Sequence, residues 1–596
     1  MPFDLKLDKE LKDDAEIRNL WLESIHIRDQ QQIFKKTNEF YDFIIVGAGT
    51  AGCVLARELI YNIPNINILV LEAGPPNTQV NDIMRSPCGF PSVHRTSETD
   101  WGYSTEDQKM PSIVDPTKEV LNKGFPYARA KVIGGCSTVN AMVYIRGQKA
   151  DYDLWAAQGH EYKIWDYEHC LEAFKAVENN SRKSPDEEFK KYHGFNGLLN
   201  VQDSSNDNYD ILKDIYKIAN NLGIPFNNDF NGVRQNGLGE HQCTMKDGKR
   251  FSLADGYLTD ALKKVETYPP SKPFEIGSPH GLSDDAAKFV AVNVKSFAHM
   301  LNIIWDEEKK DENGEVIICG GAINSAQILM LSGIGPKNNL EENNIKVRKE
   351  LPVGRNLLEH PACCVTAKVS VPNSTSASQL HYSVNGFEFG MFYKGNINGK
   401  VPSQKHFLDE RPNIQFYANT IPLGPPLIEP GKTEILTLLS VLNLPSSVGH
   451  LELHSSNPFI HPKIFLNLYE KPDDLYNMMS SLKLSREILK QPPLSTVWGV
   501  KEVGFDIDKE MSDEDWEQYI RKMSQTSFHP CGTVKMAPES QGGCINHRLQ
   551  VYGTKNLRVV DASIFPTIPA GNLNAPTAMV AWKASRLIKE DYKNKV

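Results

Sequence analysis

The chain has 596 residues, of which 40% are hydrophobic and 23% charged, with a formal net charge of -9 and a pI near 6.0. This length exceeds what one hydrophobic core usually organises, so we expect two or more domains. The acidic balance and the lack of a Lys/Arg block argue against a nucleic-acid-binding surface.

Further features of the composition indicate an intracellular, soluble protein. No run of 18 apolar residues predicts a membrane span, and the charged first 35 residues lack the apolar core of a signal peptide. The ten cysteines are scattered; Cys363 and Cys364 are adjacent, but no CxxC or Cys/His spacing predicts a metal site. We therefore expect free thiols in a reducing compartment and no bound metal.

Residues 1–40 are predicted to form a polar, helical N-terminal extension. Apolar side chains recur at a helical spacing, at Ile17, Leu20, Trp21 and Ile27. One interpretation is an arm packed on a domain surface. The other is an interaction arm, because a nucleotide-binding unit does not need this length.

The stretch from residue 42 to residue 74 predicts a nucleotide-binding βαβ unit. A buried strand over Phe43–Val46 precedes a G-x-G-x-x-G turn, and a helix then leads to a second strand over Ile66–Leu71. This motif, between an apolar strand and a strand followed by an acidic residue, indicates a site for FAD or NAD. A purely structural glycine turn is the weaker alternative.

Each residue of the motif has an expected role. Gly47 would permit the tight turn, Gly49 would let backbone N–H groups approach a pyrophosphate, and Gly52 would let helix and strand pack closely. The phosphates would lie at the helix N-terminus, where unpaired N–H groups favour negative charge. Glu72, 20 residues after Gly52, is placed to accept hydrogen bonds from a ribose diol.

The later part of the chain mixes predicted helices and strands. Helices are expected over Asp151–Asn180, Ile211–Leu222, Ala322–Ser332 and Asp473–Lys490, and strands over Asn413–Tyr417, Thr433–Leu442 and His450–Leu453. The fold class is therefore α/β and α+β: a Rossmann-like dinucleotide-binding domain interleaved with a substrate domain built on an antiparallel sheet flanked by helices.

Several further segments complete a family pattern. They are Trp101-Gly-Tyr, Gly134–Tyr144, Arg250–Leu258, Gly321–Gly335, Leu351–Pro361, His529–Met536, Leu557–Ile564 and Gly571–Thr577. Together with the glycine motif, they resemble the glucose–methanol–choline (GMC) oxidoreductases, a family of FAD-dependent alcohol oxidases and dehydrogenases. The resemblance spans about residue 41 to residue 590.

The resemblance implies FAD rather than NAD as the cofactor. It implies that Glu72 holds the adenosine ribose and that further cofactor contacts come from Gly47, Gly49, Gly52, Trp101, Gly135, Asn140, Val143, Asp561, Ala562 and Thr577. Family members with covalent flavin carry a histidine immediately before the asparagine of the first signature. Val139 stands there, so we expect non-covalent FAD.

The order of the predicted segments along the chain suggests a domain division. Residues 41–160, 230–360 and 525–596 would form the FAD-binding domain, and residues 161–229 and 361–524 the substrate-binding domain.

The family pattern places the catalytic pair at His529 and Asn574. Alcohol oxidation by a flavin needs a base for the hydroxyl proton, and imidazole titrates near neutral pH. An amide can hold the alcohol oxygen without competing for its proton. Asn572 is a competing choice for the amide, but counting back from Pro576-Thr577 favours Asn574.

Other histidines and cysteines have no partner pattern. His160, His360 and His547 are interpreted as structural, and Cys136 and Cys531 as small buried hydrophobes.

The expected function is FAD-dependent oxidation of an alcohol to an aldehyde or ketone, with hydride passing to flavin N5. The partners would be a small-molecule alcohol, preferably primary, and oxygen or a quinone-type electron acceptor. Two alternatives stay open: lyase chemistry on cyanohydrins, and a GMC fold kept as a structural, self-assembling homo-oligomer. The departures that keep the second open are the N-terminal extension, Val448, and Ala128 and Ala130 beside Arg129.

Overall fold

Residues 43–71 form the strand–helix–strand unit that the sequence predicts. In the computed structural model, β1 (Phe43–Val46) leads through the glycine turn into α4 (Thr50–Asn62), and β2 (Asn67–Leu71) returns parallel to β1. The structure describes residues 41–76, 82–89, 98–182, 186–204, 210–267, 291–295, 300, 303, 314–371, 387, 389–419, 434–503 and 509–595. The predicted extension over residues 1–40 lies outside these residues.

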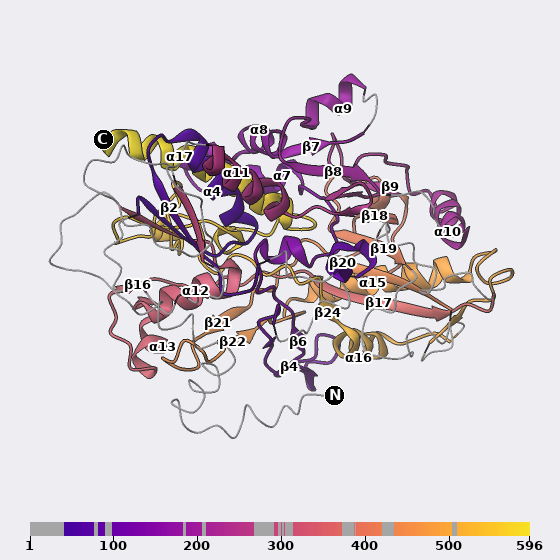
Figure 1. Cartoon of the computed structure of the whole chain (residues 1–596). Helices are drawn as coiled ribbons and strands as arrows, with labels where there is room; N and C mark the ends of the chain where they lie inside the picture. Colours follow the sequence, from indigo (N-terminus) through magenta and orange to yellow (C-terminus); the bar gives the residue numbers. More distant parts are fainter. Residues whose placement is uncertain are drawn as a thin grey trace.

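Five parallel strands form the nucleotide-binding sheet, in the order β13-β2-β1-β14-β25. The added strands are β13 (Ala291–Lys295), β14 (Glu315–Ile318) and β25 (Leu557–Val559). Helix α12 (Gly321–Leu331) follows β14, and the C-terminal helix α17 (Asn574–Lys595) packs along α4, on the left in Figure 1. Distant parts of the chain therefore meet in one Rossmann-like sheet.

A second, antiparallel sheet forms the other half of the molecule, on the right in Figure 1. Its order is β23-β17-β20-β19-β18-β9, and β24 also pairs with β17. The strands are β9 (Gly237–Glu240), β17 (Pro361–Lys368), β18 (Phe389–Tyr393), β19 (Ile414–Asn419), β20 (Ile435–Leu442), β23 (Lys501–Glu502) and β24 (Gln525–Thr526).

Helices pack on this second sheet, as the predicted fold class requires. Helix α15 (Pro472–Lys490) contacts β17, β19 and β20, α16 (Asp513–Met523) contacts α15, and α10 (Asp210–Asn221) contacts β9. The interleaved α/β and α+β architecture is confirmed. The expected domain division differs in detail, because β9 belongs to this sheet although residues 230–360 were assigned to the nucleotide-binding half.

Smaller elements surround the two sheets. A three-stranded sheet joins β7 (Glu178–Asn180), β8 (Leu199–Asp203) and β10 (Gln242–Cys243). Strand pairs are β3 (Tyr103–Ser104) with β6 (Pro126–Tyr127), β4 (Gln108–Pro111) with β5 (Glu119–Asn122), β11 (Met245–Lys246) with β12 (Lys249–Arg250), β15 (Ile334–Gly335) with β16 (Lys349–Glu350), and β21 (His450–Glu452) with β22 (Lys463–Phe465). Further helices are α5 (Asp82–Arg85), α7 (Lys149–Ala156), α8 (Tyr167–Val177), α9 (Glu187–Tyr192), α11 (Thr259–Thr267), α13 (Lys337–Glu342) and α14 (Gln404–Phe407).

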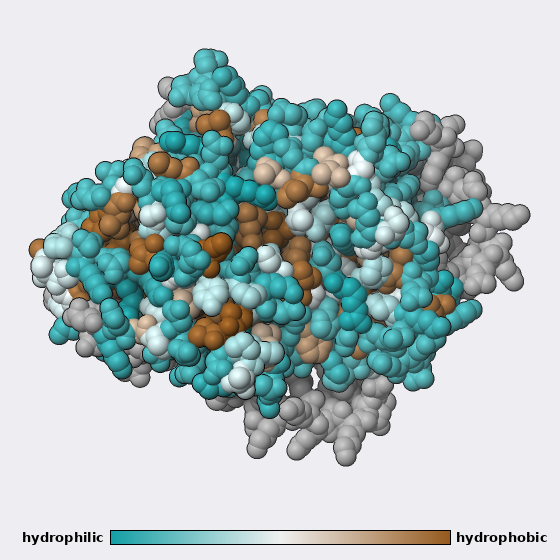
Figure 2. Space-filling model, turned by 180° about the vertical axis from the view of Figure 1, so that it is seen from behind, coloured by the Kyte–Doolittle hydropathy of each residue, from teal (hydrophilic) through white to brown (hydrophobic). Residues whose placement is uncertain are grey.

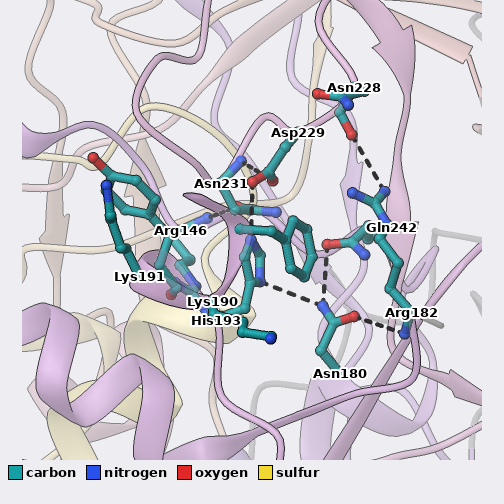
Figure 3. Close-up of polar contacts among 12 residues, drawn as sticks. Arg146, Asn180, Arg182, Lys190, Lys191, His193, Asn228, Asp229, Asn231 and Gln242 are labelled. Carbon is teal, nitrogen blue, oxygen red and sulfur yellow. Dashed lines mark hydrogen bonds and ion pairs between the residues drawn. The ribbon is translucent and has the colours of Figure 1, made fainter. Parts of the chain in front are cut away.

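A buried polar cluster ties several of these segments together (Figure 3). Arg146 forms an ion pair with Glu178, and both side chains are 1% exposed or less. The ring of His193 lies 2.9 Å from Glu178 Oε1 through Nδ1 and 3.0 Å from Asp229 Oδ2 through Nε2. The Arg146 backbone N–H donates to Asn231 Oδ1 at 2.9 Å. The cluster thereby fixes the chain directly after the first family signature.

The surface seen from behind is mostly hydrophilic, with hydrophobic side chains in separate groups (Figure 2). Among the described residues, no helix is both long and apolar enough to cross a membrane.

The buried ion pair predicts a specific loss of stability. Arg146→Leu leaves the Glu178 carboxylate buried without its cation, so we expect the free energy of unfolding to fall by about 3–5 kcal/mol in a denaturant titration. Lys190→Ala, which removes an exposed ion pair of the same region, is the control and should leave that free energy nearly unchanged. Equal losses in both variants would contradict the prediction.

Candidate active site

A cavity of about 710 Å³ lies where the two sheets meet. It extends from the glycine turn of the parallel sheet to β17, β19 and β20 of the antiparallel sheet. The site residues predicted from the sequence that line it are Gly47, Gly49, Glu72, Trp101, Gly135, Asn140, Val143, His529, Asp561, Ala562, Asn574 and Thr577.

The glycines shape one end of this cavity. Gly47 has a φ of +107°, and a Cβ there would lie 2.4 Å from the Cys319 carbonyl oxygen. Gly52 does not line the cavity; its Cβ would lie 1.9 Å from the Gly47 carbonyl oxygen, so it allows α4 to pack against the turn. Gly49 and Gly135 face one another, since a Cβ on Gly135 would lie 2.7 Å from Gly49 Cα. A side chain on Gly135 would therefore crowd the backbone at the N-terminus of α4.

Glu72 is held at the same end by the backbone. Its Oε2 accepts from Ala48 N–H and its Oε1 from Gly74 N–H, both at 2.9 Å. Burial raises the pKa of Glu72 to about 7. Each carboxylate oxygen can accept a further hydrogen bond, so a diol can still bind here.

Two further predicted residues are fixed by hydrogen bonds along the cavity. Asp561 accepts from Gly321 N–H at 2.8 Å and from Ser563 N–H at 2.7 Å, and burial raises its pKa. Asn140 Oδ1 accepts from Arg250 Nη1 at 2.9 Å. These hydrogen bonds hold both side chains at the wall of the cavity.

His529 lies at the other end, with different partners on its two ring nitrogens. Nδ1 is 3.0 Å from Nδ1 of His360, and Nε2 is 3.4 Å from Nδ2 of Asn572. Burial lowers the pKa of His360 to about 3, so that ring carries a single N–H. If His529 donates through Nδ1, its Nε2 carries the lone pair that faces Asn572.

The backbone around His529 is anchored by a buried carboxylate. Glu359 Oε1 accepts from the backbone N–H groups of both His360 and His529 at 2.8 Å, and Tyr127 donates its hydroxyl to Glu359 Oε2. Burial raises the pKa of Glu359 to about 7. The preceding residue, Phe528, has a φ of +58°, which a non-glycine residue adopts at some cost. These bonds hold the histidine loop in that conformation.

His529 is held in the neutral form. Its pKa lies well below the usual value, chiefly through burial and further through His360 and the positive charge of Arg129. Arg129 is fixed beside it by a 2.6 Å hydrogen bond from Nη2 to the Phe528 carbonyl oxygen. A histidine whose pKa is lowered stays unprotonated near neutral pH and can accept a proton.

The structure gives Asn572, Asn574 and His360 contacts that the sequence does not predict. Asn572, not Asn574, contacts His529; Asn574 begins α17, and its Oδ1 accepts from Thr50 Oγ1 at 2.8 Å. The chain turns at Gly571, with a φ of +122°, so residues two apart point to different groups. His360, for which the sequence offers no partner pattern, contacts His529 through its ring.

Sequence reasoning also missed Glu359, Tyr127 and Gln415, whose Nε2 lies 3.4 Å from Oδ1 of Asn572. Glu359 and His360 lie inside the Leu351–Pro361 segment that supported the resemblance, so this segment held a signal for both. Nothing in the sequence distinguishes Tyr127 or Gln415 from other polar residues in strands.

Comparisons with known proteins identify the family. Models of the GMC oxidoreductase family match residues 41–362 and 445–581. The chain is 32% identical over 567 residues to an alcohol dehydrogenase [acceptor] of Pseudomonas putida, covering 92% of this chain and 95% of that protein. It is 32% identical over 575 residues to a mitochondrial choline dehydrogenase of Mus musculus, covering 92% of this chain and 89% of that protein.

A solved structure shares the fold. It is a pyridoxine 4-oxidase from Mesorbium loti, with a TM-score of 0.74 at 21% identity, covering 92% of this chain and 99% of that one. The chain therefore belongs to the GMC oxidoreductase family, is an oxidoreductase, and uses FAD, the cofactor of that family.

The residues of the cavity fit FAD. The glycine turn ends at the N-terminus of α4, where the N-cap residue Gly49 has no side chain to cap the first helical N–H groups, and such N–H groups suit a phosphate. Asn574 Nδ2 is buried and has no hydrogen-bond partner among the described residues, which suits a donor to a bound group. Gly49, Glu72 and Asp561 would hold the cofactor from these positions.

We expect the flavin to be released by acid. The side chain of Val139, which lines the cavity, is a hydrocarbon and offers no nucleophile for a covalent link. Precipitation of the holoprotein with trichloroacetic acid should leave the yellow colour in the supernatant. Colour that stays with the pelleted polypeptide would show a covalent bond.

Proposed function

We propose that this GMC oxidoreductase oxidises a small, largely apolar alcohol, with His529 as the base and Asn572 binding the alcohol oxygen. The observation that carries the proposal is the convergence of His529 Nε2 and Asn572 Nδ2, 3.4 Å apart, at the wall of the cavity. A lone pair and an N–H donor at this separation can both reach one hydroxyl group.

His529 accepts the hydroxyl proton at Nε2. Its Nδ1 is engaged by His360, and its pKa, lowered chiefly by burial, keeps the ring neutral before the alcohol binds. The backbone bond to Glu359 fixes the position of the ring. No large rearrangement is then needed when the proton moves.

Asn572 donates from Nδ2 to the alcohol oxygen. The negative charge on this oxygen grows as its proton leaves, so the hydrogen bond strengthens during the reaction and lowers the barrier. Bound FAD supplies the acceptor for the hydride that leaves the α-carbon. The products are the carbonyl compound and a proton on His529, and oxygen or a quinone-type compound finally takes the two electrons.

The far wall of the cavity favours an apolar substrate. Most of its lining residues from β17, β19, β20 and the segments beside them are apolar or aromatic (Ala362, Cys364, Phe387, Tyr417, Leu439, Met523 and Phe528), and the polar Gln525, Thr526 and Ser527 lie beside them. Such a wall gains binding energy from hydrocarbon groups. A primary alcohol with an aliphatic or aromatic tail suits this wall.

Loss of the base should slow the reaction strongly. We expect His529→Ala to reduce the rate of anaerobic flavin reduction by roughly 10²–10⁴-fold, because a positioned base contributes about this factor. The measurement is stopped-flow bleaching of the oxidised flavin with a panel of primary alcohols that includes benzyl alcohol and 1-hexanol. His454→Ala is the control, since His454 is exposed and does not line the cavity.

Equal rates in His529→Ala and the wild type would refute the assignment of the base. If no alcohol of the panel bleaches the wild-type flavin, alcohol oxidation itself is refuted, and the lyase or structural alternative is favoured.

The two asparagines should differ in what their loss affects. Asn572→Ala removes the donor to the alcohol oxygen and should slow flavin reduction by about 10²–10³-fold, as for other oxyanion donors. Asn574→Ala removes a group that contacts Thr50 at the α4 N-terminus, and should chiefly weaken retention of FAD on a desalting column. The reverse pattern, with slow reduction only in Asn574→Ala, would restore Asn574 as the catalytic amide.

A further inference from the structure

Strand β19 presents two polar side chains to the cavity side of the antiparallel sheet. Gln415 and Tyr417 are two residues apart, so they lie on the same face. Their cross-strand neighbours on β20 are Val441 and Leu439, which are hydrophobic. Two polar groups therefore lie together among apolar neighbours.

The side chains of Gln415 and Tyr417 both contact the same atom of Asn572. Gln415 Nε2 lies 3.4 Å and the Tyr417 hydroxyl 3.3 Å from Oδ1 of Asn572. The Tyr417 ring is fixed by edge-to-face packing on Phe387, with the ring centroids 5.0 Å apart and an interplanar angle of 83°. Burial raises the pKa of Tyr417, so its hydroxyl keeps its proton and can donate.

A side-chain amide has one accepting and one donating end, and only the donating end can hold an alcohol oxygen. With Oδ1 turned toward Tyr417 and Gln415, Nδ2 of Asn572 is left to face His529. The reverse orientation would point a carbonyl oxygen at the lone pair of His529 and at the alcohol oxygen. Two donors to Oδ1 disfavour that orientation.

We propose that Tyr417 and Gln415 are positioning residues that fix the orientation of the Asn572 amide, an inference that rests on the proposed function. They act through Asn572 and do not take part in proton transfer. This role also explains why Gln415 is tolerated in the core. It is fully buried, and its Oε1 has no hydrogen-bond partner among the described residues, which costs stability.

Two conservative variants remove the donors without opening cavities. Tyr417→Phe keeps the ring packing, and Gln415→Met removes the unsatisfied Oε1 together with Nε2. Each is made in the wild type and in the Asn572→Ala background. Tyr393→Phe is the matched control, because the Tyr393 hydroxyl is also buried and is bonded to Ser481 Oγ at 2.6 Å.

Two properties of the FAD-loaded variants are measured. The first is the rate of anaerobic flavin reduction by benzyl alcohol or 1-hexanol. The second is the dissociation constant of 2,2,2-trifluoroethanol, which is measured from the change in flavin absorbance. The fluorines of this alcohol disfavour loss of hydride from its α-carbon. Thermal melting of every variant separates a loss of folding from a loss of orientation.

We expect each single substitution to slow reduction about 5- to 10-fold, the effect of one hydrogen bond, and to weaken trifluoroethanol binding in the same direction. In the Asn572→Ala background the same substitutions should change either property by less than about twofold, because their target is absent. Tyr393→Phe should change neither.

Equal losses in both backgrounds, or no loss in either, would overturn the proposal. If no alcohol reduces the wild-type flavin, the proposed function fails, and the trifluoroethanol arm still decides whether the two donors act through Asn572.

Discussion

The site depends on the different partners of the two ring nitrogens of His529. His360 engages Nδ1, and Asn572 lies at Nε2, so the ring offers one defined atom to the cavity. An isolated histidine could rotate or carry its proton on either nitrogen. Here Glu359 fixes the loop and the two neighbours fix the ring, so that one defined nitrogen, Nε2, faces the cavity.

The His529 end of the cavity lies where the two sheets meet. The histidine loop follows β24 at the edge of the antiparallel sheet, and Asn572 precedes α17, which packs along α4 of the nucleotide-binding half. The Asn572 amide therefore lies between β19 and the part of the cavity that would hold the cofactor. The buried ion pair of Arg146 with Glu178 joins the segment after the first signature to β7.

Some regular elements could be predicted from local patterns, whereas the helix expected over Asp151–Asn180 is divided into α7, α8 and the strand β7. The strand over Phe43–Val46 matches β1, and the expected helix over Asp473–Lys490 matches α15 within one residue. Periodicity of apolar residues carries this information directly. The position of β9 in the antiparallel sheet could not be predicted in this way, because strand pairing across more than a hundred residues leaves no local signal.

By itself, the sequence determined the family, the FAD-binding unit and His529 as the candidate base, because glycines and motif residues carry those features at fixed spacings. Only the tertiary structure decided which asparagine meets His529 and showed that His360 joins it. The direction of a side chain depends on the backbone turn that carries it, here at Gly571, and on partners from distant strands. The spacing of residues along the chain predicts neither the direction of the side chain nor its partners.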